Sequence, residues 1–380
     1  MKLFDVYPLF DIQPVKAKGS LLWDDKGEQY LDFYGGHAVI SIGHNHPHYQ
    51  ETLKNQLDKI SFYSNSVKND LQTELAEKLG ELSGYNDYTL FLCNSGAEAN
   101  ENALKLASFH TGRKKIIYFT DSFHGRTSAA VAVTDNPKIV APVNASDRFI
   151  SCEFNNIESV KTAFESNKEE IAAVIIEGIQ GVGGINIPNV EFIQELQRIC
   201  EENGTVLILD EVQSGYGRSG YFFAHQEFGI KADLITTAKG MGNGFPIAGV
   251  VISPKFKASY GLLGTTFGGN HLACAAGIAV LDVIKNENLI QNAETIGLYI
   301  ENKIKNLPHI VEIKRRGLMM GIVLDQPCAE IRKALLSKHH VFTGNANDAT
   351  VLRILPALNI TEEESDIFIT ALADILQNLD

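Results

Sequence analysis

The chain between residues 88 and 252 alternates short apolar runs with longer segments of helical periodicity. Short apolar runs predict buried strands, and apolar positions that recur every three or four residues predict amphipathic helices. The strand candidates are YTLFLC (88–93), KIIYFT (115–120), AAVIIE (172–177), TVLILD (205–210) and DLITTAK (233–239). The helix candidates between them include AEANENALKLASFH (97–110) and NVEFIQELQRICEEN (189–203). This alternation predicts a mostly parallel sheet with helices on both faces.

The two ends of the chain have a different pattern. Residues 20–33 predict a hairpin that turns at Asp25-Lys26-Gly27, and residues 311–324 and 349–356 predict further strands. A helix is expected after them, because Thr361 and Glu364 have the spacing of a capping box. We therefore expect an α/β protein with a large domain over residues 51–275. Residues 1–50 and 276–380 are expected to form a smaller α+β domain together.

Composition limits the classes of partner. The chain has 380 residues, 44% of them hydrophobic, which is enough for a large core. Its net charge of −13 argues against nucleic acid or an anionic membrane as the main partner. No apolar run reaches the roughly 20 residues of a membrane span, and acids and prolines interrupt the N-terminal segment where a signal peptide is apolar. Five scattered cysteines without a C-x-x-C pair are typical of a reducing compartment. We therefore expect a cytoplasmic protein.

Four of the predicted strands end in polar residues. The run at 88–93 leads into Asn94-Ser95-Gly96, and the next three end at Glu177, Asp210 and Lys239. The carboxyl ends of strands in an open α/β sheet form the edge where ligands bind. The sequence therefore predicts a site that combines an anion-binding turn, two acids and a lysine.

Other motifs suggest other chemistry but fit it poorly. Residues 215–220 match G-x-G-x-x-G, yet DEVQS separates them from the strand and no good helix start follows, which disfavours NAD or FAD. A P-loop is excluded because Lys239 precedes its glycines. The histidines of GHNHPH (43–48), with His37 nearby, could suggest zinc. Since Pro47 interrupts the strand that would align them, we expect a loop with no metal.

Lys239 precedes the glycine-rich segment GMGNG, and no carboxylate lies beside it in the sequence. A lysine in this place suits a nucleophilic amine that forms a Schiff base with a carbonyl. If that carbonyl belongs to pyridoxal phosphate, the site also needs a phosphate cradle, an acid for the ring nitrogen and groups on both ring faces. The candidates are Ser95, Gly96 and Ala97 for the phosphate, Asp210 for the nitrogen, and Phe123 and Val212 for the ring faces.

With these residues identified, the chain resembles the class III (ω-amino) aminotransferases, pyridoxal-phosphate enzymes of fold type I. The resemblance covers nearly the whole chain and follows the family's motif order. The motifs are LWDDKGEQYLDFYGGHAVISIGHNHP, NSGAEANENALKLA, FHGR, DEVQSGYGRSG, AKGMGNGFPIAG and TTFGGNHLACAAG. Chain length, FHGR and LRILPAL make it most similar to the acetylornithine aminotransferases of arginine biosynthesis.

The resemblance implies a role for each site residue. Lys239 would bond the cofactor and carry the proton, while Asp210 would pair with the ring nitrogen and Gln213 with the phenolic oxygen. Phe123 would stack on the ring, with Val212 behind it, and the turn at Ser95 would hold the phosphate. The resemblance also implies a homodimer with shared active sites, in which Thr266 reaches the phosphate of the other subunit.

The substrate roles are implied in the same way. Arg126 would grip the α-carboxylate of an N-acylated ornithine, with Thr265 nearby. Glu177 and Arg353 would form a switch, in which Glu177 neutralises Arg353 for the ω-amine and releases it for the α-carboxylate of glutamate or 2-oxoglutarate. The expected reaction is ping-pong transfer of the δ-amino group between N-acetylornithine and 2-oxoglutarate.

Alternatives remain at this point. The chain could act on N-succinylornithine, ornithine or 4-aminobutyrate, or it could use the same fold for another reaction. It departs from the family pattern at Ala97, where threonine is usual, and at Gly178 and Val182 in EGIQGVGG, where E-P-I-Q-G-E-G-G is usual. His37 stands where an apolar residue is common. These departures bear on the phosphate and on the acyl end of the substrate.

Overall fold

A seven-stranded sheet forms the centre of the computed structural model, which describes residues 1–167 and 169–379. Its strands are in the order β4-β10-β9-β8-β7-β5-β6. Strand β10 pairs antiparallel with both β4 and β9, and the other pairs are parallel. Because β10 is antiparallel to both of its neighbours, β4 runs in the same direction as β5 to β9. The strands are β4 (Thr89–Cys93), β5 (Lys115–Phe119), β6 (Phe149–Cys152), β7 (Ile171–Glu177), β8 (Val206–Asp210), β9 (Leu234–Thr237) and β10 (Ala248–Ile252).

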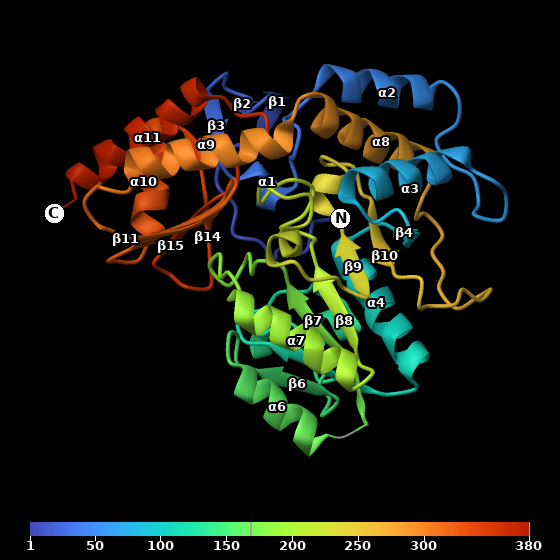
Figure 1. Ribbon diagram of the computed structural model, residues 1–380. Helices are drawn as coiled ribbons and strands as arrows, with labels where there is room; N and C mark the ends of the chain where they lie inside the picture. The colour runs from blue at the N-terminus through green and yellow to red at the C-terminus, as the bar shows by residue number, and fades with distance from the viewer. Residues whose placement is uncertain (168, 380) are drawn as a thin grey trace.

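Both faces of this sheet are buried under helices, as the sequence predicts. In β7, Val174 and Ile176 join the cluster that contains α7, while Ala173 and Ile175 join the cluster that contains α4. Successive strand residues point to opposite faces, so an apolar run without alternation is stable only when both faces are covered. The helices on the two sides are α4 (Gly96–Thr111) and the pair α6 (Ile157–Ser166) and α7 (Val190–Glu202) (Figure 1).

The predicted hairpin is confirmed and belongs to a second sheet. In its turn, the Asp24 carboxylate accepts hydrogen bonds from Lys26 N (3.0 Å) and Glu28 N (2.9 Å). Strand β3 also pairs in parallel with β13, so segments from the two ends of the chain share one sheet. Its strands are β1 (Pro14–Lys18), β2 (Leu21–Asp24), β3 (Gln29–Asp32) and β13 (Val341–Phe342).

A third sheet, in the order β11-β12-β15-β14, occupies the C-terminal part. The predicted capping box is present, because Thr361 Oγ accepts from Glu364 N while the Glu364 side chain accepts from Thr361 N. The elements here are β11 (Ile310–Arg316), β12 (Met319–Leu324), β14 (Gly344–Asn345), β15 (Val351–Ile354), α9 (Leu289–Ile304), α10 (Ala329–His339) and α11 (Glu362–Gln377).

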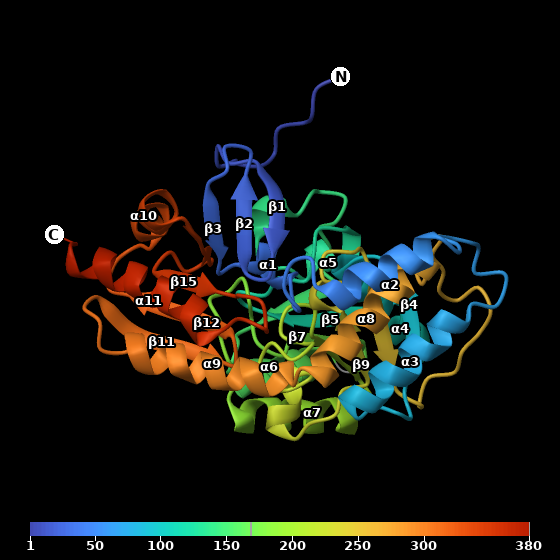
Figure 2. The ribbon, with the colours of Figure 1, turned by 90° about the horizontal axis from the view of Figure 1, so that it is seen from above.

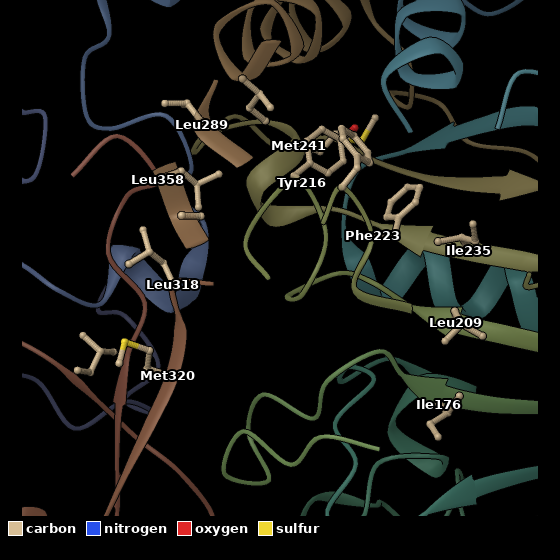
Figure 3. Close-up of a cluster of buried hydrophobic side chains, with 14 of the residues drawn as sticks. Ile176, Leu209, Tyr216, Phe223, Ile235, Met241, Leu289, Leu318, Met320 and Leu358 are labelled. Carbon is tan, nitrogen blue, oxygen red and sulfur yellow. The ribbon is translucent and has the colours of Figure 1, made fainter. Parts of the chain in front are cut away.

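We propose the division into residues 51–275 and residues 1–50 with 276–380, and the β3–β13 pairing supports it. Helix α8 runs through the expected boundary and contacts α2 and α3 (Figure 2). One hydrophobic cluster continues from Ile176 and Leu209 of the large sheet to Met320 and Leu358 of the C-terminal part (Figure 3). The two parts therefore share a core. The three helices are α2 (Pro47–Leu57), α3 (Asp70–Ser83) and α8 (His271–Asn286).

The remaining helices are short: α1 (Gly35–Ala38), α5 (Ser128–Ala132) and the 3-10 segments Pro137–Ile139, Ala224–Phe228 and Lys239–Met241. All five cysteines are buried free thiols. Over residues 1–167 and 169–379, no helix combines the length and the apolar character that crossing a membrane requires.

Candidate active site

A cavity of about 380 Å³ lies at the carboxyl ends of β4, β7, β8 and β9. This is the edge that the sequence predicts, because β10 alone reverses direction and leaves these four strands aligned. The predicted site residues that line the cavity are Ser95, Gly96, Ala97, Phe123, Arg126, Glu177, Asp210, Val212, Gln213 and Lys239.

The N-terminus of α4 forms one wall. Ser95 Oγ accepts a hydrogen bond from Glu98 N (3.2 Å), and Glu98 Oε2 in turn accepts from Asn94 N and Asn94 Nδ2, each at 2.9 Å. The amides of Gly96 and Ala97 lie in the first turn, where backbone N–H groups have no intrahelical acceptor and attract anions. A Cβ on Gly96 would lie 2.7 Å from Val212 Cγ1, so only glycine allows this close approach to the loop after β8. The wall therefore suits a phosphate group.

Asp210 is buried and held by three donors. Its Oδ2 contacts His124 Nδ1 at 2.7 Å and accepts from Asn100 Nδ2 at 2.8 Å, while its Oδ1 accepts from Val212 N at 3.0 Å. These contacts orient the carboxylate at the base of the cavity. Neither His124 nor Asn100 is predicted as a site residue from the sequence, although FHGR and NSGAEANENA contain them. Both lie far from Asp210 in sequence, so only the fold reveals the contacts.

Lys239 follows β9 and is half-buried, with a backbone φ of 44° in the left-handed region. Such a conformation is uncommon for a residue with a Cβ and is frequent at functional sites. Burial lowers the pKa of Lys239, while Asp210 and Glu177 raise it and Arg353 lowers it further. A lowered pKa increases the fraction of neutral amine, which is the nucleophilic form.

Glu177 and Arg353 are joined through the backbone N–H and C=O of Gly181. The Glu177 carboxylate accepts from Phe123 N (3.0 Å) and Gly181 N (2.9 Å), while Arg353 Nη1 donates to Gly181 O (3.1 Å). Burial raises the pKa of Glu177 to about 7 and lowers the pKa of Arg353. Arg353 does not line the cavity itself, but its Nη1 also donates to Gln213 Oε1 at 3.3 Å.

Three further predicted residues lie at the mouth or beyond it. Arg126 is exposed, and its Cζ lies 6.0 Å from the centre of the Phe123 ring. Thr265 Oγ accepts from Asn94 Nδ2 at 3.2 Å, which places it next to the α4 wall. Thr266 is exposed on the neighbouring loop. Its expected contact with another subunit stays a prediction.

The histidines of residues 43–48 and the glycine-rich segment 215–220 lie in other surroundings. His44, His46 and His48 each pair with a different carboxylate, from Asp32, Glu287 and Asp282 respectively. The glycine-rich segment 215–220 lies in turns, and no α-helix follows it before β9.

A half-buried lysine, a buried carboxylate and a helix N-terminus around one cavity are the arrangement that the sequence predicts for a pyridoxal-phosphate enzyme. Residues 5–376 match the family described as "Aminotransferase class-III". The chain belongs to this family, and its fold is type I of the pyridoxal-phosphate-dependent transferases.

Several known proteins are similar over nearly their full length. The chain is 40% identical over 371 residues to the acetylornithine aminotransferase of Bacillus subtilis, covering 95% of this chain and 94% of the relative. It is 40% identical over 361 residues to that of Archaeoglobus fulgidus, covering 92% of each. Its fold resembles the acetylornithine aminotransferase structure from Elizabethkingia anophelis, with a TM-score of 0.84, 26% identity and coverage of 98% and 95%. The ornithine aminotransferase from Toxoplasma gondii has a TM-score of 0.90 at 26% identity, covering 97% of this chain and 91% of that one.

Proposed function

We propose that this aminotransferase uses pyridoxal 5'-phosphate to move the δ-amino group between N-acetylornithine and 2-oxoglutarate, as a step in arginine biosynthesis. The observation that carries the proposal is the convergence of Lys239, Asp210 and the α4 N-terminus on one cavity. The relatives named acetylornithine aminotransferase support the choice of substrate.

The cavity residues fit this cofactor. The first-turn amides of Gly96 and Ala97, with Ser95, would hold the phosphate, and their geometry does not depend on the hydroxyl that Ala97 lacks. Asp210 would pair with the ring nitrogen, oriented by His124 and Asn100. The cofactor, when bound, supplies an electron sink for negative charge at the substrate carbon. The residues expected at the ring and its substituents are Phe123, Val212, Gln213 and Lys239.

Residues of the chain would transfer the proton, bind the substrate carboxylates and exclude water. Lys239 Nζ, whose pKa is lowered by burial, would take the proton from the amine-bearing carbon of the substrate and return a proton later in the same half-reaction. Arg126 at the mouth would bind the α-carboxylate of the acylornithine, so that the δ-amine enters first. Arg353 would bind the α-carboxylate of 2-oxoglutarate or glutamate through a charge-assisted hydrogen bond from its guanidinium. The apolar residues Val39, Val182 and Phe245 line the cavity and would exclude water from it.

We also propose a cytoplasmic homodimer whose subunits share their active sites. Two exposed apolar side chains lie together beside Thr266. They are Phe62 and Phe267, and their ring centres are 5.4 Å apart. An exposed apolar group of this kind is typical of a surface that a partner covers.

The test compares kcat/KM for N-acetylornithine, N-succinylornithine, ornithine and 4-aminobutyrate with 2-oxoglutarate as acceptor. N-Acetylornithine should give the highest value, with one glutamate formed per amine consumed. A tenfold preference for another amine would assign the enzyme to that substrate instead. No glutamate from any donor would overturn the proposed reaction altogether.

A further inference from the structure

Tyr34 lies against Arg353 and has no role in the mechanism above. The Arg353 Cζ atom is 6.0 Å from the centre of the Tyr34 ring, which is within the range of a cation–π contact. Gly344 pairs with Arg353 across β14 and β15, and a Cβ on Gly344 would clash with Tyr34 Cε2. The ring therefore packs on the Gly344 backbone and beside the guanidinium. A side chain at position 344 would exclude it.

His37 is hydrogen-bonded to the hydroxyl group of Tyr34. The Tyr34 hydroxyl makes a short hydrogen bond to His37 Nδ1, and the two ring centres are 4.7 Å apart. His37 has a φ of 68° and Ala38 a φ of 62°, so two residues with a Cβ occupy the left-handed region in succession. This conformation is unfavourable for residues with a Cβ. The Asp32 carboxylate stabilises the turn, because its Oδ1 accepts from Tyr34 N (3.1 Å) and Gly35 N (2.8 Å).

Both side chains are shifted toward their neutral forms. His37 is exposed at the surface but partly desolvated, and this desolvation lowers its pKa together with the positive charges of Arg353, Lys239 and Arg332. Burial raises the pKa of Tyr34, against the positive charges of Arg353 and Arg332, which lower it. A neutral tyrosine donates its proton to a neutral imidazole, which increases the electron density of the ring that faces the guanidinium.

The hydrogen bonds of Arg353 to the described residues leave its Nη2 atom for a ligand. Its Nε donates to Asn345 O at 2.5 Å, and its Nη1 donates to Gly181 O and Gln213 Oε1. Within the described residues these bonds engage Nε and Nη1, so Nη2 remains for a carboxylate. Three backbone or amide acceptors define the guanidinium plane, and the tyrosine ring supports one of its faces.

We propose that Tyr34 and His37 are positioning residues, which hold Arg353 ready for the α-carboxylate of the oxo acid. They thereby favour the glutamate half-reaction without contacting the reacting atoms. This inference rests on the proposed function, because it takes Arg353 as the residue that binds 2-oxoglutarate. His37 departs from the apolar residue common at its position, and this role gives the departure a physical reason.

The test uses the enzyme loaded with pyridoxal phosphate and three variants. Tyr34→Leu removes the ring, Tyr34→Phe keeps the ring without the hydroxyl, and His37→Ala removes the acceptor at a backbone geometry that the adjacent Ala38 already tolerates. Tyr34→Leu should raise the KM for 2-oxoglutarate and the Kd for glutarate, measured by calorimetry, about tenfold. The other two variants should raise both about two- to fivefold. The KM for N-acetylornithine should change less than twofold in all three.

A double-mutant cycle separates positioning from general support of the fold. In an Arg353→Ala background, Tyr34→Leu should not weaken glutarate binding further, because the group it positions is gone. Tyr221→Leu, a change at a half-exposed tyrosine on another loop, is the matched control and should leave both constants unchanged. Equal losses for both substrates in Tyr34→Leu, or additive losses in the cycle, would overturn the inference. If the wild-type enzyme neither binds glutarate nor uses 2-oxoglutarate, the proposed function itself fails, and the inference with it.

Discussion

Lys239 and Glu177 line the same cavity, and burial shifts their pKa values in opposite directions. An apolar environment disfavours the charged form of each side chain, so the lysine loses its proton more easily and the acid keeps it longer. A neutral amine near a retained proton is a suitable arrangement for moving protons at neutral pH. Both shifts depend on the closed sheet edge and not on the residues next to them in sequence.

Replacing Lys239 tests the most central assignment at this scale. Lys239→Ala should abolish amino transfer by many orders of magnitude, because the variant has neither the nucleophile nor the proton carrier. Pyridoxal phosphate should still bind through the α4 wall. Borohydride reduction followed by mass spectrometry should attach the cofactor to the peptide containing Lys239 in the wild-type protein only. A variant with a tenth of the wild-type rate would contradict the assignment.

Asp210→Asn should leave the fold intact and slow the single-turnover rate. A neutral amide cannot hold the ring nitrogen of the cofactor protonated, and losing one charge-assisted pair at a buried site is worth about 3–4 kcal/mol, or roughly 100- to 1000-fold in rate. Rapid-mixing measurements of one half-reaction provide the test, with circular dichroism as the control for folding. An unchanged rate would remove Asp210 from this role.

Glu177 should make stability depend on pH. Its folded pKa of about 7 exceeds the ordinary value of 4.5, so the folded protein binds this proton more tightly than the unfolded chain does. That contribution to stability is complete below pH 4.5 and is lost as the pH rises through about 7. The glutamine in Glu177→Gln does not titrate. When the pH is raised from 5 to 8, the free energy of unfolding of this variant should therefore fall by roughly 2–3 kcal/mol less than that of the wild type. Urea unfolding of the cofactor-free proteins at both values would measure this, and parallel pH profiles would contradict it.

At the scale of elements, the site depends on how closely α4 approaches the loop after β8. The Gly96 backbone packs against Val212, and a Cβ would lie 2.7 Å from Cγ1 and 3.0 Å from Cγ2 of that side chain. Gly96→Ala should therefore reduce the free energy of unfolding by about 1–3 kcal/mol, the usual effect of overpacking. It should also weaken binding of pyridoxal phosphate, because the first-turn amides must move.

The double variant Gly96→Ala with Val212→Ala is the control. Removing the two methyl groups of Val212 opens the space that the new Cβ needs, so stability should partly return. Urea unfolding and fluorescence titration with pyridoxal phosphate would measure the two effects. If the second change adds its own loss instead, the contact between α4 and this loop does not limit the site.

At the scale of the whole molecule, Arg218 connects three separate parts of the chain. Its guanidinium donates to Leu318 O (3.3 Å), Pro356 O and Ile40 O (3.4 Å), and Leu318 N donates back to Arg218 O at 3.0 Å. Burial lowers its pKa to about 9, which leaves it charged at neutral pH. The arginine therefore attaches the loop after β8, which also contains Gln213, to the C-terminal part.

Arg218→Met should destabilise the protein by about 2–4 kcal/mol. The substitution leaves buried carbonyls without donors, at roughly 1–3 kcal/mol each, and removing the buried charge offsets part of that loss. Unfolding in urea gives the total, and hydrogen exchange should show faster opening of residues 318–324 and 351–358. Arg198→Met is a suitable control, since Arg198 pairs with Glu195 and Glu202 on the surface of α7 and should matter little. Equal effects of the two changes would contradict the role of Arg218.

The sequence alone was sufficient for the strands that are buried on both faces, such as 172–177 and 205–210. Their unbroken apolar runs and the polar residues that end them are local features, and parallel strands necessarily bring those ends to one edge. The predictions omitted β6 and β10, whose short segments FISC and AGVVI mix in small or polar residues. Strand direction is not encoded in the pattern, so the reversal of β10 also could not be predicted from it.

Tertiary structure decided everything that depends on contacts between distant segments. It brings His124 and Asn100 to Asp210, places the backbone of Gly181 between Glu177 and Arg353, and sets Tyr34 beside that arginine. The pKa shifts belong here too, because desolvation is a property of the packed cavity and not of a residue's neighbours along the chain. The sequence determined that Ser95, Glu177, Asp210 and Lys239 reach one edge of the sheet, because strand ends and helix starts are local. Their distances, partners and protonation depend on the packing of elements that lie far apart in the chain.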